Sequence, residues 1–135
     1  MGYLITGANG FIGSYVLREF LKFQNVYASR RNPKNNIKCQ LSREPIWINK
    51  SFYEISKRDL KDIKVIVHLS AAGVSPKVVS KNEIYEINVD KTFDFFKKAI
   101  NSGIELFISC GTCLEYGMGG NGFDKIPTYA ELLPL

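Results

Sequence analysis

The sequence predicts an α/β fold with a doubly wound parallel sheet of about five strands. Three observations support this prediction. Short apolar runs recur along the 135 residues, segments of helical or loop character separate them, and a glycine-rich turn follows the first run. Strands that alternate with helices are joined by right-handed crossovers, and such sheets bind ligands at the carboxyl ends of their strands. The functional residues are therefore expected directly after the strands.

The first half of the chain contains three apolar runs that we interpret as strands. They cover residues 3–6, 26–29 and 46–48. Between the first two runs, apolar residues recur at helical spacing and predict a helix over about residues 11–23. The polar stretch around Pro33 indicates a loop over residues 32–36. A short helix is expected over residues 51–60.

The second half predicts two more strands, one on each side of a long helix. Residues 65–69 are apolar without alternation, as in a strand covered on both faces, and residues 106–108 form the fifth strand. The helix is expected over residues 83–102, with Gly103 at its end. Its inward residues are predicted to be Ile84, Ile87, Phe95, Phe96, Ala99 and Ile100. A glycine-rich coil follows the last strand, and residues 1–135 are interpreted as one domain.

The turn after the first strand has the composition of a phosphate-binding site. Gly7, Gly10 and Gly13 lie three residues apart, between the strand and the helix. At such a turn the backbone N–H groups and the helix dipole face an anion, and glycine lets phosphates approach closely. A tight strand-to-helix turn also needs glycine for structural reasons alone. The spacing by itself therefore leaves both interpretations open.

Composition narrows the classes of partner and the cellular setting. The formal net charge is +5, but the basic residues are dispersed and no aromatic stacking platform accompanies them, which argues against nucleic-acid binding. No apolar run is long enough to cross a membrane, so no membrane partner is expected. Three cysteines, an odd number, indicate a reducing, cytoplasmic setting.

Two candidate metal or redox signals are weak. Cys110 and Cys113 form a Cys-x-x-Cys motif, but a glycine-rich loop follows it rather than the helix start of a redox pair. A zinc site needs two further ligands, and no second pair exists in the sequence, so no metal site is predicted. His68, the only histidine, ends an apolar run and is interpreted as a core residue.

Four ordered segments resemble the extended short-chain dehydrogenase/reductase family, which includes nucleotide-sugar epimerases and dehydratases. They are LITGANGFIGSYV at the start, VIVHLSAAG at the fourth strand, IYEINVDKTFDFFKKAINSGIELFIS over the long helix, and GTCLEYG after the fifth strand. The resemblance implies a Rossmann-type domain that binds a dinucleotide. The residues that it places at the cofactor are Gly7, Asn9, Gly10, Phe11, Ile12, Gly13, Leu69, Ser70, Ala71 and Asn88.

The end of the second strand indicates which dinucleotide is bound. NAD-binding proteins place an acidic residue there, about 20 residues after the glycines, to bond the ribose 2′-hydroxyl. Here the strand ends in Ser29, Arg30 and Arg31, and an arginine can pair with a 2′-phosphate. The sequence therefore predicts NADP as the preferred cofactor, held by Arg30 and Arg31, with NAD as the alternative. Asn49 stands near the position where the family usually has an aspartate after the third strand.

The resemblance also implies hydride transfer to or from a nucleotide sugar. In the family a Tyr-x-x-x-Lys pair transfers the accompanying proton, and a Ser or Thr, here the catalytic candidate Thr112, orients the substrate hydroxyl. Family dehydratases have Asp and Glu directly after this residue, where this chain has Cys113 and Leu114. Epimerisation or 4-ketone reduction therefore remains as the expected reaction.

The proton-transferring tyrosine and lysine have no counterpart where the family places them. A Tyr53-x-x-x-Lys57 motif lies before the fourth strand, whereas the family's pair follows the position of Thr112, so Tyr53 is interpreted as a packing or surface residue. The last segment, DKIPTYAELLPL, resembles the stretch just before the family's pair. We therefore expect an incomplete domain, without the later strands and the substrate domain, that has no activity alone.

Two expectations about partners remain. The fifth strand would leave an apolar edge with unpaired N–H and C=O groups, which predicts a homodimer or edge-strand association. Since the proton-transferring pair is missing, the alternative to part of an enzyme is a non-catalytic NAD(P)-binding sensor or partner-binding module. Thr112 and Asn88, which match family positions, favour the enzyme.

Overall fold

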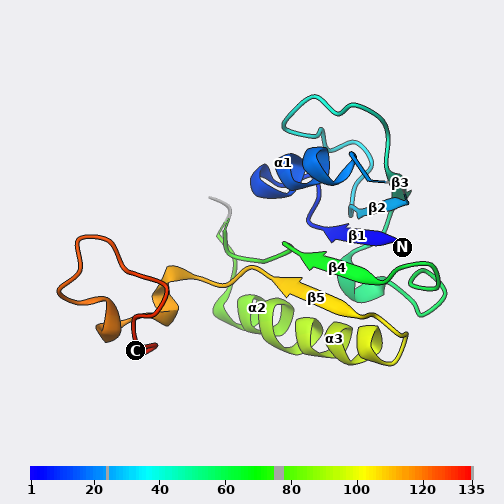
Figure 1. Cartoon of the computed structure of the whole chain (residues 1–135). Helices are drawn as coiled ribbons and strands as arrows, with labels where there is room; N and C mark the ends of the chain where they lie inside the picture. The colour runs from blue at the N-terminus through cyan, green and yellow to red at the C-terminus, as the bar shows by residue number, and fades with distance from the viewer. Residues whose placement is uncertain (24, 75–77, 135) are drawn as a thin grey trace.

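The computed structural model describes residues 1–23, 25–74 and 78–134, and it contains the predicted parallel sheet (Figure 1). Five strands lie in the order β3-β2-β1-β4-β5, and every neighbouring pair is parallel. Their bounds are Tyr3–Thr6 (β1), Val26–Ser29 (β2), Ile46–Ile48 (β3), Val65–His68 (β4) and Leu106–Ser109 (β5). The predicted fold class and all five strands are confirmed, with ends that differ by at most one residue.

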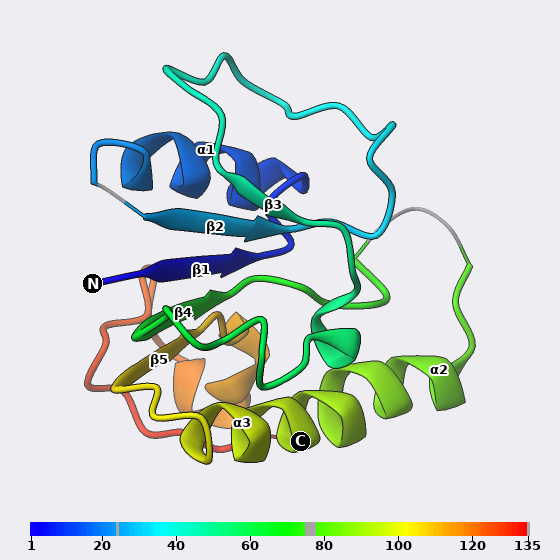
Figure 2. The same ribbon diagram turned by 90° about the vertical axis from the view of Figure 1, so that its right-hand side faces the viewer.

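Helices cover the sheet on both faces (Figure 2). Helix α1 (Phe11–Phe20) lies on one face, and the continuous run of α2 (Lys81–Tyr85), a π-helical segment (Glu86–Lys91) and α3 (Thr92–Ile100) lies on the other. Alternate residues of the central strands supply the two cores, as the pleat requires. One core contains Ile5, Leu17 and Val67, and the other contains Leu4, Ile66 and Phe95.

The helix predicted over residues 51–60 is wrong. The structure has only a 3₁₀ turn, Phe52–Glu54, after which Ile55 is extended with φ −63° and ψ 124°. Two local hydrogen bonds explain the difference. The Glu54 carboxylate accepts from the Ser51 backbone N–H at 2.8 Å, and the Asp59 carboxylate accepts from the Ser56 N–H at 2.8 Å. Each bond begins a separate turn, so the chain caps twice instead of continuing one helix.

The long helix on the other face is also more complex than predicted. It begins at Lys81 rather than at residue 83, because the Ser80 hydroxyl caps it by accepting from the Glu83 N–H at 3.2 Å. The α-helix ends at Ile100, and Gly103 follows in the left-handed region with φ +78°, as its predicted stop role requires. Ile100 is 73% exposed, so its predicted inward position is wrong. The buried stripe of α3 is narrow and centred on Phe95 and Ala99.

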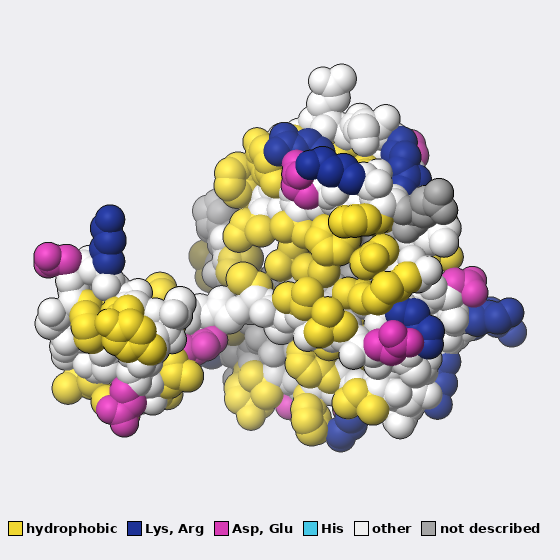
Figure 3. All heavy atoms as spheres, viewed as in Figure 1, with side chains coloured by type: hydrophobic (Ala, Val, Ile, Leu, Met, Phe, Trp, Pro, Cys, Tyr) yellow, Lys and Arg dark blue, Asp and Glu magenta, His cyan; other side chains and the backbone are white. Residues whose placement is uncertain are grey.

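Strand β5 is the last strand of the sheet on its side, among the residues described. Leu106 and Ile108 remain 51% and 45% exposed, and hydrophobic side chains gather over the strands between α1 and α3 (Figure 3). Beyond β5 the chain leaves the sheet and folds on itself, where the Met118 N–H donates to the Leu133 carbonyl at 3.0 Å. Association through this edge stays a prediction. Within the described ranges, no helix has the length and apolar character needed to cross a membrane.

Candidate functional site

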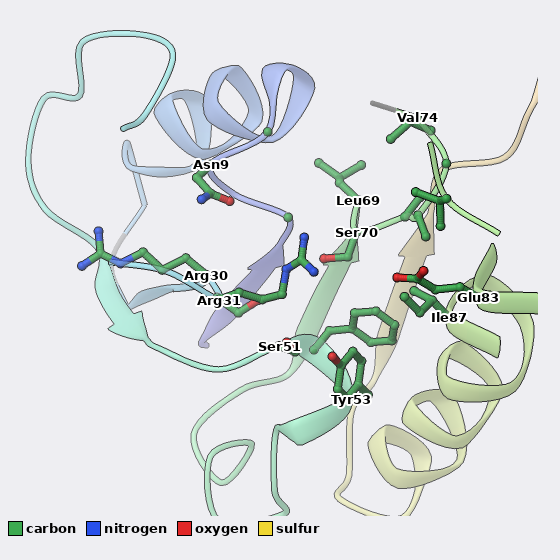
Figure 4. A pocket seen from close by; sticks show the side chains of 18 of the residues that line it. Asn9, Arg30, Arg31, Ser51, Tyr53, Leu69, Ser70, Val74, Glu83 and Ile87 are labelled. Carbon is green, nitrogen blue, oxygen red and sulfur yellow. The ribbon is translucent and has the colours of Figure 1, made fainter. Parts of the chain in front are cut away.

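The carboxyl ends of the strands open into a cavity of about 560 Å³ (Figure 4). The segments that follow β1, β2, β3 and β4 all contribute to its walls, as the sheet topology predicts. Eight of the residues selected from the sequence line it. They are Gly7, Asn9, Gly10, Arg30, Arg31, Leu69, Ser70 and Ala71.

The glycine turn joins β1 to α1 through very close backbone contacts. Gly7 has φ +66°, and a Cβ there would lie 2.7 Å from the Leu69 carbonyl oxygen. A Cβ on Gly13 would lie 2.0 Å from the Gly7 carbonyl oxygen, so α1 packs directly on the turn. Gly10 differs, because a Cβ there meets only the Gly7 oxygen, at 3.1 Å, and its free side faces the cavity.

The N-terminus of α1 is open toward an anion. Gly10 is the N-cap residue, and in the described part of the chain no side chain caps the helix and no acidic residue lies in its first turn. The first N–H groups of a helix have no partner within the helix, so those of Phe11, Ile12 and Gly13 are available to a ligand. The side chains of Phe11 and Ile12 are 73% and 57% exposed, and they are not part of the cavity lining.

One end of the cavity is basic. The Arg30 guanidinium lies 3.9 Å from the centre of the Trp47 ring, and its Nε donates to the Asn49 side-chain oxygen at 2.9 Å. Arg31 beside it is exposed, and Lys50 lines the same region. Among the residues that the structure describes, the lining contains one carboxylate, Glu83, which lies on the opposite side of the cavity from the two arginines (Figure 4).

Lys50 is held in place by an ion pair. Its Nζ lies 2.7 Å from the Asp59 carboxylate, which also accepts from Ser56. Burial acts to raise the pKa of Asp59, but the hydrogen bonds from Lys50 and Ser56 outweigh it and lower that pKa to about 2. Asp59 is therefore ionised at neutral pH, and its charge keeps the ammonium group at the cavity wall.

Besides Phe11 and Ile12, three further candidates lie outside the lining: Gly13, which is buried, Asn88 and Thr112. The Asn88 side chain clamps the turn after β4: its oxygen accepts from the Ala72 N–H at 2.7 Å, and its nitrogen donates to the Ala72 carbonyl at 3.0 Å. Thr112 is exposed in the segment beyond β5, where its hydroxyl accepts from the Leu114 N–H at 3.3 Å. Asn88 thus acts on the cavity through Ala72, whereas Thr112 is not brought to it.

Sequence reasoning missed the cavity wall contributed after β3. Ser51 and Tyr53 line the cavity together with Lys50, and the Tyr53 ring, interpreted as packing or surface, packs against Lys91 at 4.3 Å. The rule that ligands bind after parallel strands was a sufficient signal for these residues. The other missed lining residues are Ser29, Phe52, Ala72, Gly73, Val74, Val78, Val79, Glu83 and Ile87.

His68 lies at the end of β4, beneath the cavity, and its interpretation as a core residue is confirmed. It is 4% exposed, and its ring packs against Phe52 and Phe95, with centroid distances of 4.7 Å and 5.8 Å. Its Nδ1 lies 2.8 Å from the Thr6 hydroxyl. Burial lowers the pKa of His68 from 6.5 to about 4, because the charged form loses hydration among these rings.

The burial of His68 predicts a loss of stability in mild acid. In the unfolded chain, His68 binds a proton once the pH falls below its ordinary pKa of 6.5. In the folded chain, the ring stays neutral until the pH approaches the lowered pKa of about 4. Stability is therefore complete above the unfolded pKa and falls as the pH approaches the folded pKa. We expect the free energy of unfolding to fall by about 2 kcal/mol between about pH 7.5 and pH 5. Urea titrations at several pH values measure it. A His68→Asn variant should lose this slope, and an equal slope in both proteins would contradict the assignment.

Comparison with known proteins identifies the family of the chain. The model of the NAD dependent epimerase/dehydratase family matches residues 3–133. The chain belongs to this family. No curated protein sequence matches the chain. The assignment of the chain to this family therefore rests on the family model, and the solved structures described next are consistent with it.

Solved structures with the same fold extend the comparison. A short-chain dehydrogenase/reductase superfamily protein from Agrobacterium tumefaciens with bound NAD aligns over 100% of the chain, with TM-score 0.77 and 17% identity. A UDP-N-acetylglucosamine 4-epimerase from Methanobrevibacter ruminantium aligns over 98%, with TM-score 0.78 and 21% identity. MoeE5, in complex with UDP-glucose and NAD, aligns over 100%, with TM-score 0.76 and 26% identity. The chain spans 40%, 44% and 43% of these structures.

Proposed function

We propose that this chain is the dinucleotide-binding portion of an NAD(P)-dependent nucleotide-sugar epimerase or 4-ketoreductase. The observation that carries the proposal is the open N-terminus of α1 beside Gly10, which faces the cavity without a cap or an acidic neighbour. A diphosphate needs this combination of free N–H groups, a positive helix end and no side chain. The basic end and the wall formed by Leu69, Ser70 and Ala71 give the cavity two further regions, suited to the two nucleosides of the cofactor.

The residues of the chain fit a dinucleotide in defined roles. The N–H groups of residues 11–13 would bind the diphosphate, and Arg30 and Arg31 the adenosine ribose and its substituent. Asn88 would hold the wall through Ala72. When bound, the nicotinamide supplies hydride transfer. The chain's own residues bind the cofactor, orient it and exclude water from one of its sides.

The substrate is proposed to be a nucleotide sugar. MoeE5 is described in complex with UDP-glucose, and the Methanobrevibacter enzyme is named as a UDP-N-acetylglucosamine 4-epimerase. Cys113 and Leu114 follow Thr112 where the family's dehydratases have Asp and Glu, so the pair of carboxyl groups used to eliminate water is missing from these two positions. Elimination of water from the sugar is therefore not proposed, and epimerisation or ketone reduction is.

The charge of the basic end favours NADP over NAD as the preferred cofactor. Arg30 and Arg31 would face a 2′-phosphate at this end, and Arg30 is already oriented by Trp47 and Asn49. Lys50 adds a third positive group there, although its charge is partly offset by the ion pair with Asp59. We expect NADPH to bind at least about tenfold more tightly than NADH, because a charge-assisted hydrogen bond contributes on this scale. Calorimetric titration measures both affinities.

Two variants of equal charge change test this preference. Arg30→Asp should reverse the preference, whereas Lys61→Asp, on an exposed turn outside the lining, should keep it. Equal affinities for the two cofactors in the parent chain would refute the preference. If neither NADPH nor NADH binds, the proposed function itself is refuted.

The chain alone is expected to bind cofactor without turnover. Hydride transfer to a ketone leaves an alkoxide that needs a proton donor, and such acid–base help accelerates reactions by about 10² to 10⁴. Thr112 is too weak an acid near neutral pH and lies away from the cavity. Assays with NADPH and a panel of nucleotide sugars measure turnover. Turnover that persists on purification and disappears in Thr112→Ala would contradict this expectation.

A non-catalytic dinucleotide-binding module is the second candidate. The observation in its favour is the position of Thr112, which is exposed beyond β5 instead of lining the cavity. The two candidates differ in what a bound cofactor does to a nucleotide sugar. An enzyme portion should bind UDP-sugars in the presence of NADPH, and a sensor should bind the dinucleotide alone.

A further inference from the structure

A network of hydrogen bonds lies beneath the cavity and joins two residues of its lining, Leu69 and Ile87, through Thr6, His68 and Thr92, which are not part of the lining. It begins at the Leu69 backbone N–H, which donates to the Thr6 hydroxyl oxygen at 3.2 Å. That hydroxyl lies 2.8 Å from Nδ1 of His68, and Nε2 of the same ring lies 3.5 Å from the Thr92 hydroxyl. The Thr92 hydroxyl in turn donates to the Ile87 carbonyl at 3.0 Å.

The direction of each proton in this network is assigned from the groups at its two ends, the Leu69 N–H and the Ile87 carbonyl. Thr92 gives its only hydroxyl proton to the Ile87 carbonyl, so it can only accept from the His68 Nε2. The His68 ring is then protonated at Nε2, and its Nδ1 must accept the proton of the Thr6 hydroxyl. The Thr6 oxygen stays free to accept from the Leu69 N–H.

The surroundings of His68 leave the ring no competing partners. Aromatic rings of Phe52, Phe95, Phe96 and Phe107 lie within 6.0 Å of its centroid. None of these side chains can donate or accept a conventional hydrogen bond. Among the described residues, no buried side-chain nitrogen or oxygen lacks a partner. The neutral, Nε2-protonated ring is therefore the form that satisfies every group in the chain.

Both ends of the chain stop at the cavity wall. Leu69 lines the cavity after β4, and Ile87 lines it from the π-helical segment. The residue after Ile87 is Asn88, which clamps Ala72 in the same wall, and the residue after Thr6 is Gly7 of the glycine turn. The histidine thus ties together three wall segments that are distant in the sequence.

We propose that His68 is a positioning residue for dinucleotide binding, which sets the wall after β4 and the π-helical segment relative to the glycine turn through the chain Leu69–Thr6–His68–Thr92–Ile87. The proposal rests on the proposed function of the cavity. A helix widened by one residue per turn places its Ile87 carbonyl within reach of the Thr92 hydroxyl, five residues later. The π-helical segment is therefore the structural partner of His68 in this role.

Nitrogen NMR of the histidine ring tests the proton directions directly. The protein has one histidine, so protein labelled with ¹⁵N in histidine alone gives one pair of ring-nitrogen signals. We expect the neutral ring protonated at Nε2 at neutral pH. A ring protonated at Nδ1, or a mixture of the two tautomers, would overturn the proposal, and this readout does not depend on any ligand.

Substitution of Thr92 tests the positioning role. Thr92→Val keeps the side-chain shape but removes the hydroxyl, and we expect it to weaken NADPH and NADH binding by about three- to tenfold. Thr92→Ser keeps the hydroxyl and should restore parent affinity. Ile63→Val, in the buried core away from the cavity, serves as the stability control. It removes a buried methylene but none of the hydrogen bonds between Leu69 and Ile87.

The outcomes separate positioning from general stability and from failure of the proposed function. Weakened binding in Thr92→Val, with parent affinity in Thr92→Ser and Ile63→Val, supports the proposal. Equal binding by all four proteins overturns it. If the parent binds no dinucleotide, the proposed function fails, and hydrogen exchange then decides the structural claim. Faster exchange of the Ala72 N–H in Thr92→Val, with Leu4 unchanged, supports it, and unchanged exchange at Ala72 overturns it.

Discussion

Gly10→Val is expected to weaken dinucleotide binding by at least about 100-fold while the chain stays folded, because two or more charge-assisted hydrogen bonds are lost together. The valine side chain would occupy the space in front of the α1 N-terminus that the diphosphate needs. The backbone at Gly10 does not require glycine, since its φ of −71° suits any residue. A Cβ there meets one atom, the Gly7 oxygen at 3.1 Å, which has to move by a few tenths of an ångström.

Calorimetry with NADPH measures this loss, and far-ultraviolet circular dichroism checks the fold. Tyr15→Val is the matched control, because it introduces the same side chain on α1 outside the lining of the main cavity. It should bind as the parent does. A Gly10→Val protein that is folded and binds normally would show that the diphosphate lies elsewhere.

Gly13→Ala is expected to lower the free energy of unfolding by at least about 3 kcal/mol, the upper range for overpacking a buried site. The added methyl carbon would lie 2.0 Å from the Gly7 oxygen, 2.8 Å from the Gly7 carbonyl carbon and 3.0 Å from the Ala8 Cα. All three are backbone atoms of the glycine turn, so no side chain can rotate away. Helix α1 has to move off β1 instead, and its contacts through Leu17 are weakened.

Urea denaturation followed by circular dichroism measures this effect. Gly10→Ala, the same substitution one turn earlier, is the matched control, and it should leave stability within about 1 kcal/mol of the parent. Small domains are stable by about 5–15 kcal/mol, so the Gly13 variant loses a large share of the total. Equal stability of the two variants would contradict the close packing of α1 on the turn. These two predictions together assign Gly10 to the proposed ligand and Gly13 to the packing of α1.

The strands were predictable because burial on both faces leaves a simple mark in the sequence. β4 is a continuous apolar run, and β1 and β2 are short runs next to glycine or arginine turns. The conformations of residues 51–60 and 86–91 were not predictable, because particular hydrogen bonds determine the backbone there. In the sequence, Asp59 and Thr92 count only as polar residues. Their hydrogen-bond partners, the Ser56 N–H and the Ile87 carbonyl, are visible only in the folded chain.

The candidate site divides in the same way. The glycine turn and the arginines after β2 were predicted as part of the site because anion binding needs definite residue types at a definite place, and Gly7, Gly10, Arg30 and Arg31 do line the cavity. Ser51 and Tyr53 have no such chemical mark, and they belong to the cavity only because β3 ends beside it. The family motif led to Thr112, but a motif does not state how the segment beyond β5 folds.

The central place of β1 in the sheet has a consequence for the order of folding. β1 pairs with β2 nearby in the chain, but its other edge pairs with β4, and the contact between Thr6 and His68 spans 62 residues. Closing so long a loop costs entropy before any pairing energy is gained, and distant pairings of this kind slow folding. The glycine turn rests on Leu69, so it acquires its final shape only when β4 arrives. During synthesis on the ribosome, the glycine turn of the candidate site therefore stays incomplete until β4 has emerged, although it precedes β4 by about 60 residues in the chain.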